Sequence, residues 1–185
     1  AARRATQRPP AVTGKVAIGF LHPGEHKACF SNSLHDLILH DLFGEQRIVS
    51  HPHGKMGKET GSGQIAAGRN RLAAASLESD AEWLWLVDSD MGFAKDTVEQ
   101  LIAVADPDTR PVVGGLAFAM KSDGEGPFFA RRYRATPTLY RMWETDDEVG
   151  FVPMFDYPRG QLVEVDATGA ACLLVHRSAL QRIRD

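Results

Sequence analysis

The sequence predicts an α/β fold: a mostly parallel sheet flanked by helices, followed by a small mixed or antiparallel C-terminal part. Three observations support this prediction. Short apolar segments alternate with helical segments between residues 15 and 120. The third apolar segment ends in two aspartates, at the edge where such sheets bind ligands. After Met120 the alternation stops, and short strand-like segments separated by turn residues follow.

The part of the chain up to residue 120 is predicted to run strand, helix, strand, helix, strand, helix, strand. The apolar run Lys15–Phe20 predicts the first buried strand. Apolar residues at helical spacing predict a helix over Ala28–Phe43, which Gly44 ends. The other elements expected here are a strand at Arg47–Ser50, a loop at residues 51–63, a helix at Gln64–Ser79, a strand at Glu82–Val87, a helix at Lys95–Val104 and a strand at Pro111–Met120.

Beyond residue 120 the expected elements are shorter. They are a loop at residues 121–127, strands around 128–133, 138–143 and 161–165, a buried strand at 169–177 and a helix that begins at Ser178. We therefore expect a flexible lead-in at residues 1–14 and a single domain at residues 15–185. Within that domain we expect a ligand-binding half at 15–120 and a second half at 121–185. Because the last helix has barely begun when the chain stops, we expect the domain to be truncated at its C-terminus.

Composition excludes several classes of protein. The 185 residues are 43% hydrophobic, and the net charge of 21 − 24 = −3 gives no strongly basic surface for nucleic acid. No apolar run approaches the roughly 20 residues that span a bilayer, and residues 1–14 lack the apolar core of a secretory signal. Cys29 and Cys172 lie among apolar neighbours without C-x-x-C spacing, which indicates buried thiols. These features together predict a cytoplasmic protein.

Neither common glycine motif for nucleotides is present. A dinucleotide-binding turn would carry G-x-G-x-x-G after the first strand, where this chain has only Gly24. A P-loop would end in G-K-[ST], whereas Gly57-Lys58 is followed by Glu59. A nucleotide is therefore expected to bind without a glycine-rich phosphate loop.

Asp88 and Asp90 follow the apolar strand directly. Residues two apart on a strand point to the same face, so both carboxylates are expected to enter the ligand crevice together. Two carboxylates that close repel each other, and a hard divalent cation with oxygen ligands relieves the repulsion. The spacing therefore predicts that Asp88 and Asp90 hold Mg²⁺ or Mn²⁺.

Arg69 is expected on the buried face of its helix. Ile65, Leu72 and Ser76 lie at −4, +3 and +7 from it and share that face. A guanidinium there needs an anionic or carbonyl partner. The sequence leaves two partners open: a phosphate or base carbonyl of a ligand, and a carboxylate of the protein itself.

These motifs together resemble a known family. The stretches "GRNRLAAASLESDAEWLWLVDSDMGF" (residues 68–93) and "VEVDATGAACLLVHRSAL" (residues 163–180) resemble the Arg-Asn helix, D-x-D strand and Gly-Ala strand of GT-A fold glycosyltransferases, close to family 2. The resemblance implies a Rossmann-like GT-A fold, with residues 15–120 as the nucleotide-sugar-binding half and 121–185 as the acceptor side. It also implies metal-dependent, inverting transfer of a sugar from a nucleotide diphosphate sugar, with a UDP-sugar favoured over a GDP-sugar as the donor.

The resemblance implies roles for particular residues. Asp88 and Asp90 correspond to the metal-binding D-x-D, with Mn²⁺ or Mg²⁺ as the cofactor. The positions that correspond to nucleotide-sugar contacts are Leu21, His22, Pro23, Gly24, Ser50, Arg69, Asp88, Ser89, Asp90, Gly169 and Ala170. Inverting relatives take the catalytic base from a Glu-Asp pair beyond the Gly-Ala strand, which this chain does not reach. Asp166 is the substitute candidate, and the base itself is expected from a further segment, another domain or an oligomer partner.

Two other functions remain open at this point. One is a non-catalytic nucleotide-sugar-binding domain, or a catalytic half that needs a further segment. The other is a sugar nucleotidyltransferase, which shares the sheet but usually carries a glycine-rich basic loop after the first strand. The sequence also leaves the acceptor open among a glycan, a lipid, a protein and a modified nucleic-acid base.

Overall fold

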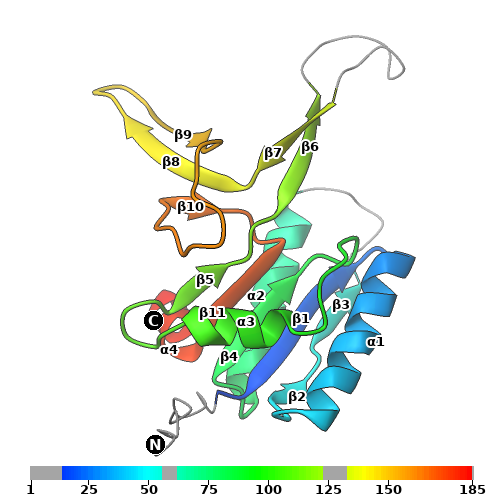
Figure 1. Ribbon diagram of the computed structural model, residues 1–185. Helices are drawn as coiled ribbons and strands as arrows, with labels where there is room; N and C mark the ends of the chain where they lie inside the picture. Colours follow the sequence, from blue (N-terminus) through cyan, green and yellow to red (C-terminus); the bar gives the residue numbers. More distant parts are fainter. Residues whose placement is uncertain (1–13, 56–61, 123–132, 185) are drawn as a thin grey trace, which may run out of the picture.

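The computed structural model describes residues 14–55, 62–122 and 133–184 (Figure 1). Most of the predicted lead-in, most of the loop predicted at 121–127 and the predicted strand around 128–133, except for Tyr133, lie outside these ranges. The remaining predictions can be compared with the structure element by element.

A six-stranded sheet forms the centre of the molecule, in the order β2-β1-β4-β11-β5 with β3 also paired to β1. Its strands are β1 (Val16–His22), β2 (Ile48–Ser50), β3 (His53–Lys55), β4 (Trp83–Val87), β5 (Val112–Gly114) and β11 (Cys172–His176). β1 runs parallel to β2, β3 and β4, whereas β11 runs antiparallel to β4 and β5. The sheet is therefore mixed, and the prediction of a mostly parallel sheet is not confirmed, because β11 inserts between β4 and β5.

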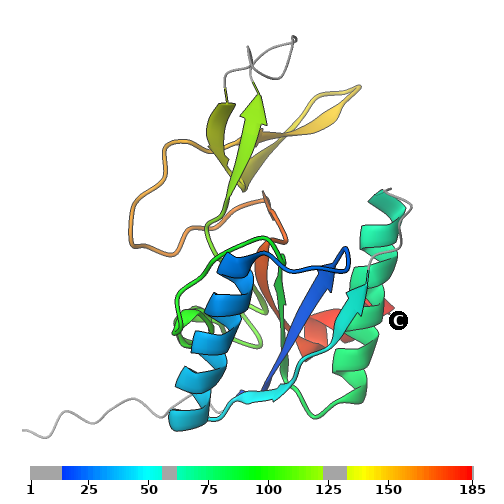
Figure 2. The same ribbon diagram turned by 90° about the vertical axis from the view of Figure 1, so that its right-hand side faces the viewer.

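Helices cover both faces of this sheet. They are α1 (Ala28–Phe43), α2 (Ser62–Glu78), α3 (Thr97–Val104) and α4 (Arg177–Arg184), close to the four predicted helices. α1 and α3 lie on one face, and α2 and α4 lie on the other (Figure 2). In the part of the chain that the structure describes, no helix combines the length and the hydropathy needed to cross a membrane.

The remaining strands form two small antiparallel sheets that extend away from the central sheet (Figure 1). One contains β6 (Phe118–Ser122) and β7 (Tyr133–Pro137), and the other contains β8 (Leu139–Glu144), β9 (Val149–Pro153) and β10 (Ala167–Thr168). The small antiparallel part expected after residue 120 is thus present.

Several strand predictions need correction. The strand predicted at residues 111–120 is divided into β5 and β6, which belong to different sheets. The division follows Gly115, whose N–H donates to the Cys172 carbonyl at 2.8 Å and whose added Cβ would lie 2.6 Å from Cys172 Sγ. The strand predicted at 161–165 is absent, and β3 and β9 were not predicted. β3 lies within the stretch predicted as a loop, where glycines and polar residues hide a strand that pairs only with β1.

The core consists of two layers separated by the central sheet. Trp83, Trp85 and Val87 of β4 pack toward α1 and α3. Leu84 and Leu86 pack toward α2 and α4. Trp83 and Trp85 are 1% and 0% exposed, so they belong to the core. The same alternation aims the next residue of this series, at position 88, toward α2.

The two cysteines differ in exposure. Cys172 in β11 is buried, as predicted. Cys29, in the first turn of α1, is exposed, and the prediction that it is a buried thiol is wrong. Its neighbour Phe30 packs into the core, while the Cys29 thiol faces the turn after β4 and donates to the Asp90 carbonyl at 3.6 Å.

A buried carboxylate holds the chain as it passes from α1 to β2. Asp41 is 6% exposed and accepts the backbone N–H groups of Arg47 at 2.8 Å and Ile48 at 3.1 Å. Replacing Asp41 by asparagine leaves only one acceptor oxygen and turns an amide NH₂ toward a backbone donor. We expect Asp41→Asn to lower the free energy of unfolding by about 1–3 kcal/mol in urea titrations. The exposed Asp36→Asn on the same helix is the control, and an unchanged midpoint in Asp41→Asn would contradict this account.

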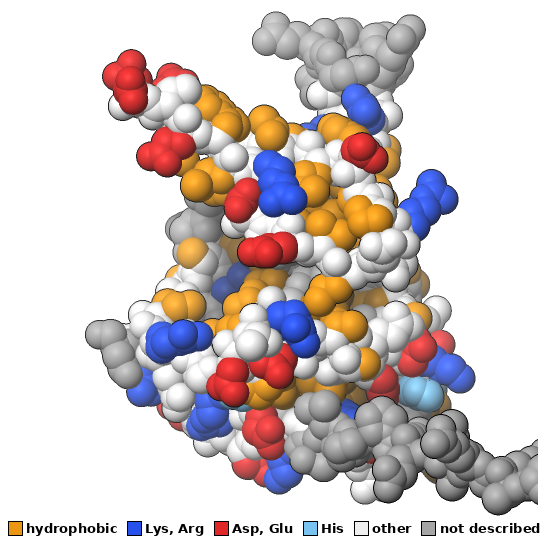
Figure 3. All heavy atoms as spheres, turned by 60° about the vertical axis from the view of Figure 1, so that its left-hand side comes forward, with side chains coloured by type: hydrophobic (Ala, Val, Ile, Leu, Met, Phe, Trp, Pro, Cys, Tyr) orange, Lys and Arg blue, Asp and Glu red, His pale blue; other side chains and the backbone are white. Residues whose placement is uncertain are grey.

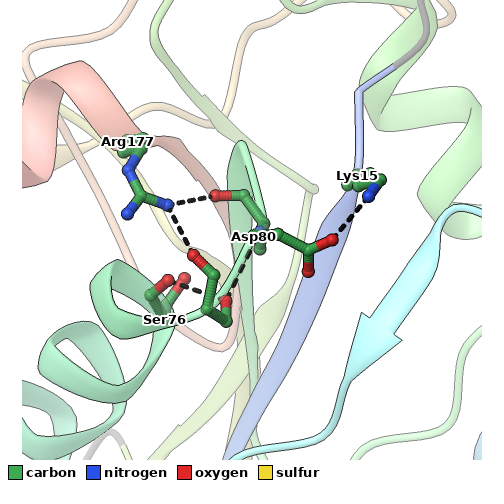
Figure 4. A network of polar contacts seen from close by, with 6 residues as sticks. Lys15, Ser76, Asp80 and Arg177 are labelled. Carbon is green, nitrogen blue, oxygen red and sulfur yellow. Dashed lines mark hydrogen bonds and ion pairs between the residues drawn. The ribbon is translucent and has the colours of Figure 1, made fainter.

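The end of α2 is fixed by side chains from distant elements (Figure 4). Arg177 Nη1 donates to the carbonyl oxygens of Ser79 at 3.0 Å and Ala81 at 2.7 Å, and Nη2 donates to the Leu77 carbonyl. Asp80, in the same turn, pairs with Lys15 at 2.5 Å. The turn between α2 and β4 is thereby attached to both α4 and β1.

Candidate functional site

A pocket of about 410 Å³ lies at the carboxyl ends of β1 and β4. β1 and the loop after it form one wall, α2 forms a second, and the end of β4 with residues 88–90 forms a third. This is the edge at which ligands bind in open α/β sheets. The charged residues that line it, among those that the structure describes, are Glu25, Lys27, Arg69, Asp88 and Asp90.

Asp88 continues the inward alternation of β4 toward α2. Its carboxylate oxygen Oδ1 accepts a hydrogen bond from Arg69 Nη2 at 2.9 Å, and the same nitrogen lies 3.4 Å from the Ala170 carbonyl oxygen. The Asp88 side chain is 44% exposed and that of Arg69 30% exposed, so the pair remains open to the pocket. Of the two partners that the sequence left open for Arg69, the structure shows a carboxylate of the protein.

α2 packs closely against the end of β1 at Gly68. A Cβ added at Gly68 would lie 2.7 Å from Leu21 Cδ1, so a larger residue there would force the Leu21 side chain to move. Leu72 and Ser76 are buried on the same face of α2, as predicted, whereas Ile65 is 43% exposed and borders the pocket. Close packing of α2 against β1 thus places Arg69 beside the end of β4.

Asp90 reaches the pocket by a different route from the one predicted. β4 ends at Val87, and the Met91 N–H donates to the Asp88 carbonyl at 3.2 Å, which closes a turn. The Lys27 N–H donates to the Ser89 carbonyl at 3.3 Å and ties this turn to the start of α1. Asp90 is exposed and lines the pocket. The turn, not the two-residue period of a strand, places Asp90 beside Asp88.

The electrostatics of the pocket favour a cation. Burial raises the pKa of Asp88; the positive charge of Arg69 opposes this rise, and the negative charge of Asp90 adds to it. The five charged side chains that line the pocket comprise two positive and three negative ones. A further positive charge between Asp88 and Asp90 would relieve their repulsion.

The raised pKa of Asp88 predicts a pH effect on stability. A carboxyl whose pKa is higher in the folded than in the unfolded protein makes the free energy of unfolding fall as pH rises through the window from its ordinary value of 3.8 up to the raised value. Asp88→Asn removes this contribution while it keeps an acceptor for Arg69. We therefore expect the unfolding free energy of Asp88→Asn, relative to that of the wild type, to increase between pH 4 and pH 7 in urea titrations. A constant or shrinking difference would contradict the burial of the Asp88 charge.

The described residues contain no group of three or more His, Cys, Asp and Glu side chains arranged to hold a metal ion. Asp88 and Asp90 would therefore supply at most two protein ligands. Mg²⁺ is usually bound in this way, through one or two carboxylates with water and substrate phosphate in the other positions. The two carboxylates therefore fit a cation that a phosphate ligand also helps to bind. They do not fit a structural metal site in which the protein supplies all the ligands.

The loop after β1 contributes only part of what was predicted. Leu21, Pro23 and Ser89 line the pocket beside the charged residues. His22 and Gly24 do not line it: the Gly24 N–H donates to His22 Nδ1 at 3.2 Å, and the His22 ring packs edge-on against His26 at a centroid distance of 4.7 Å. Gly24 has φ 122°, a conformation that favours glycine, and it reverses the chain before α1.

Three predicted residues from other segments do not line the pocket: Ser50, Gly169 and Ala170. Ser50 ends β2, and its buried hydroxyl has no hydrogen-bond partner in the described residues. The Gly169 N–H donates to the Thr138 carbonyl at 3.1 Å, and Ala170 offers its carbonyl to Arg69.

Asp166, the candidate base, is exposed and lies outside this pocket. Its Oδ2 accepts the Met142 N–H at 2.9 Å, and its own N–H donates to the Tyr140 carbonyl at 3.1 Å. The structure therefore gives Asp166 the role of attaching the chain before β10 to β8.

Sequence reasoning missed Glu25 and Lys27, which both line the pocket. Lys27 immediately precedes α1, and its ammonium group has no ion-pair or hydrogen-bond partner among the described residues. The only signal was position: both residues follow the predicted first strand, where the ligand crevice begins.

No family model matches this chain, and no curated protein sequence matches it. Among solved structures, the chain is similar to a glycosyltransferase involved in the glycosylation of the major capsid of PBCV-1, with a TM-score of 0.47 and 12% sequence identity. The similarity covers 92% of this chain and 63% of that chain, so this chain spans less than two thirds of that structure. A similarity of this size assigns no activity, and the function has to be inferred from the pocket itself.

Proposed function

We propose that this protein is a metal-dependent glycosyltransferase that transfers a sugar, with inversion, from a nucleotide diphosphate sugar. A UDP-sugar is favoured over a GDP-sugar as the donor. The observation that carries the proposal is the chemistry around one pocket. Asp88 and Asp90, with Glu25 as a third carboxylate, and the two cations Arg69 and Lys27 line a crevice at the strand ends. A divalent cation at Asp88 and Asp90, together with Lys27, would give a diphosphate favourable charges there.

The proposed cofactor is Mn²⁺ or Mg²⁺, held by Asp88 and Asp90. Such an ion would neutralise the charge that develops on the leaving diphosphate. Asp88 Oδ1 already accepts a hydrogen bond from Arg69, whereas Oδ2 and the Asp90 carboxylate have no hydrogen-bond partner among the described residues. Arg69 fixes the orientation of Asp88 and favours its ionised form, against the effect of burial.

The cation Lys27 is proposed to contact the diphosphate directly. Arg69 is already paired with Asp88, whereas the Lys27 ammonium is uncommitted within the described residues. Its backbone N–H holds the 88–90 turn through Ser89, so a ligand that draws Lys27 inward also steadies the turn that carries Asp90. We propose that Lys27 and the bound cation together compensate the phosphate charge.

A non-catalytic nucleotide-sugar-binding module is the second candidate. It is favoured by one observation: besides the two aspartates, Glu25 is the only carboxylate among the described residues that line the pocket, and Asp166 is engaged elsewhere. An inverting transfer needs a base that accepts the proton of the acceptor hydroxyl. The two candidates therefore differ in turnover and agree in binding.

The test combines binding with turnover. We expect the melting temperature to rise with UDP-glucose or UDP-N-acetylglucosamine in the presence of Mn²⁺, to rise less with GDP-mannose, and to change little when EDTA removes the metal. Release of nucleoside diphosphate from the sugar donor then reports transfer or slow hydrolysis. Pyrophosphate release from UTP and a sugar 1-phosphate is the separate assay for a nucleotidyltransferase.

Each outcome selects one reading. Metal-dependent stabilisation with release of UDP supports the glycosyltransferase, and stabilisation without release supports the binding module. Pyrophosphate release supports the nucleotidyltransferase. The proposal fails if no nucleotide sugar changes the melting temperature of the wild type with or without metal.

A further inference from the structure

A second pocket, of about 430 Å³, lies between the end of β5, the starts of β6 and β8, and residues 157–163. Its volume is in the range of small-molecule sites. Figure 3 shows this side of the molecule, where hydrophobic side chains gather around a hollow between the central sheet and the antiparallel sheets. It shares no lining residue with the pocket around Asp88.

One wall of this second pocket is a strap, defined here as residues 154–166, without regular secondary structure beyond a turn. Both ends of the strap are fixed to β8: the Met154 N–H donates to the Leu139 carbonyl at 2.8 Å, and the Asp166 N–H donates to the Tyr140 carbonyl at 3.1 Å. Gly160, at the turn of the strap, has φ 67°. Hydrogen bonds to β8 hold the two ends of the strap, and residues 157–163 in its middle line the second pocket.

The walls are apolar and incompletely covered. Leu116 is 47% exposed, Phe118 53% exposed and Leu162 56% exposed, although all three line the hollow. Leu139 and Val163 are half-buried beside them. Several large apolar side chains that converge on one concavity leave a hydrated surface that an apolar ligand would cover with a gain in free energy.

The only charge on the lining is positive. Arg159 alone carries a charge among the described residues that line the second pocket, and it has no ion-pair partner in the described chain. Tyr157 and Gln161 add a hydroxyl and an amide from the same strap. An uncommitted guanidinium at the rim of an apolar hollow is complementary to an anionic group attached to an apolar body.

We infer that this second pocket binds a small amphipathic anion, with its apolar body against Leu116, Phe118 and Leu162 and its anionic group on Arg159. The inference does not rest on glycosyl transfer. It uses neither Asp88 nor Asp90, and it holds whether or not a nucleotide sugar binds at the first pocket.

The test uses decyl phosphate as the probe, below its micelle concentration and without nucleotide or metal, in isothermal titration calorimetry. We expect saturable binding to the wild type. Arg159→Gln is expected to weaken the binding of decyl phosphate about tenfold or more, because a hydrogen bond to a charged group is lost, and to leave the binding of decanol unchanged. Phe118→Ser and Leu162→Ser are expected to weaken both probes.

Matched controls are Arg71→Gln on the exposed face of α2 and Phe43→Ser, at a side chain that is 85% exposed at the end of α1. Both are expected to bind decyl phosphate like the wild type. The inference is overturned if the wild type shows no saturable binding, if Arg159→Gln and Phe118→Ser bind like the controls, or if inorganic phosphate binds as tightly as decyl phosphate. All variants change exposed side chains, and circular dichroism checks that each is folded.

Discussion

Replacing Asp90 by asparagine is expected to abolish the metal-dependent rise in melting temperature with UDP-sugar and to lower sugar transfer about a hundred- to a thousandfold. Asp90 is exposed, its carboxylate has no hydrogen-bond or ion-pair partner in the described residues, and its charge repels Asp88, so the substitution should not lower the stability of the free protein. Loss of function without loss of stability is the signature of a ligand-binding carboxylate. Thermal melts with and without Mn²⁺, together with an assay of released UDP, measure both effects.

Asp36→Asn is the matched control, because Asp36 is an exposed aspartate on α1 outside the pocket lining. It should retain the full response to metal and UDP-sugar. Asp88→Asn should also lose the response, but it removes a partly buried charge and therefore also changes the pH dependence of stability. If Asp90→Asn keeps the metal response and the activity of the wild type, the proposed metal site is refuted, whatever function the pocket has.

The position of Asp88 could be predicted from the sequence because it depends on local geometry. A continuous apolar run from Trp83 to Val87 predicts a buried strand, and the two-residue period fixes which side each residue faces. The same argument fails for Asp90, because the strand ends first and a turn takes over. The prediction that both aspartates share one crevice is met, and the reason given for Asp90 was wrong.

The order of strands in the central sheet could not be predicted from local patterns. β11 lies between β4 and β5, and its partners are about 60 to 90 residues away along the chain. The apolar run at 111–120 has no charge or proline in its interior, and the pair Gly114-Gly115 is the one sequence signal at the point where the chain leaves the central sheet. The contact of Gly115 with Cys172 shows that the division occurs there. Hydrophobic patterns specify that a segment is buried and leave open which strand it joins.

The candidate site shows the same limit. Arg69 was predicted from its helical face, yet its partner Asp88 depended on how α2 packs beside the end of β4. Lys27 and Glu25 have no pattern that separates them from surface charges; they line the pocket because the loop after β1 folds back along the 88–90 turn. Periodicity placed Arg69 on its helical face, whereas nothing in the sequence singled out Glu25 and Lys27 in the loop after β1.

Replacing Arg177 by methionine is expected to lower the free energy of unfolding by about 2–4 kcal/mol, the largest stability effect of a polar substitution that we predict. The guanidinium donates to three carbonyl oxygens, those of Leu77, Ser79 and Ala81. The Leu77 carbonyl belongs to the last turn of α2, and those of Ser79 and Ala81 follow it; a positive charge at this end of a helix also interacts favourably with the helix dipole. Methionine keeps the apolar stem of Arg177 and leaves the three acceptors without a donor from the protein.

Urea titrations followed by circular dichroism measure the effect of this substitution. Arg177→Lys should recover part of the loss, because an ammonium can reach one or two of the carbonyls without the planar geometry of the guanidinium. Arg182→Met, an exposed arginine on the same helix, is the matched control and should unfold at the wild-type midpoint. The hydrogen bonds of Arg177 attach α4 to the turn that leads into β4. If Arg177→Met is as stable as the control, β11 and the apolar layer around Leu84 hold α4 in place without these hydrogen bonds.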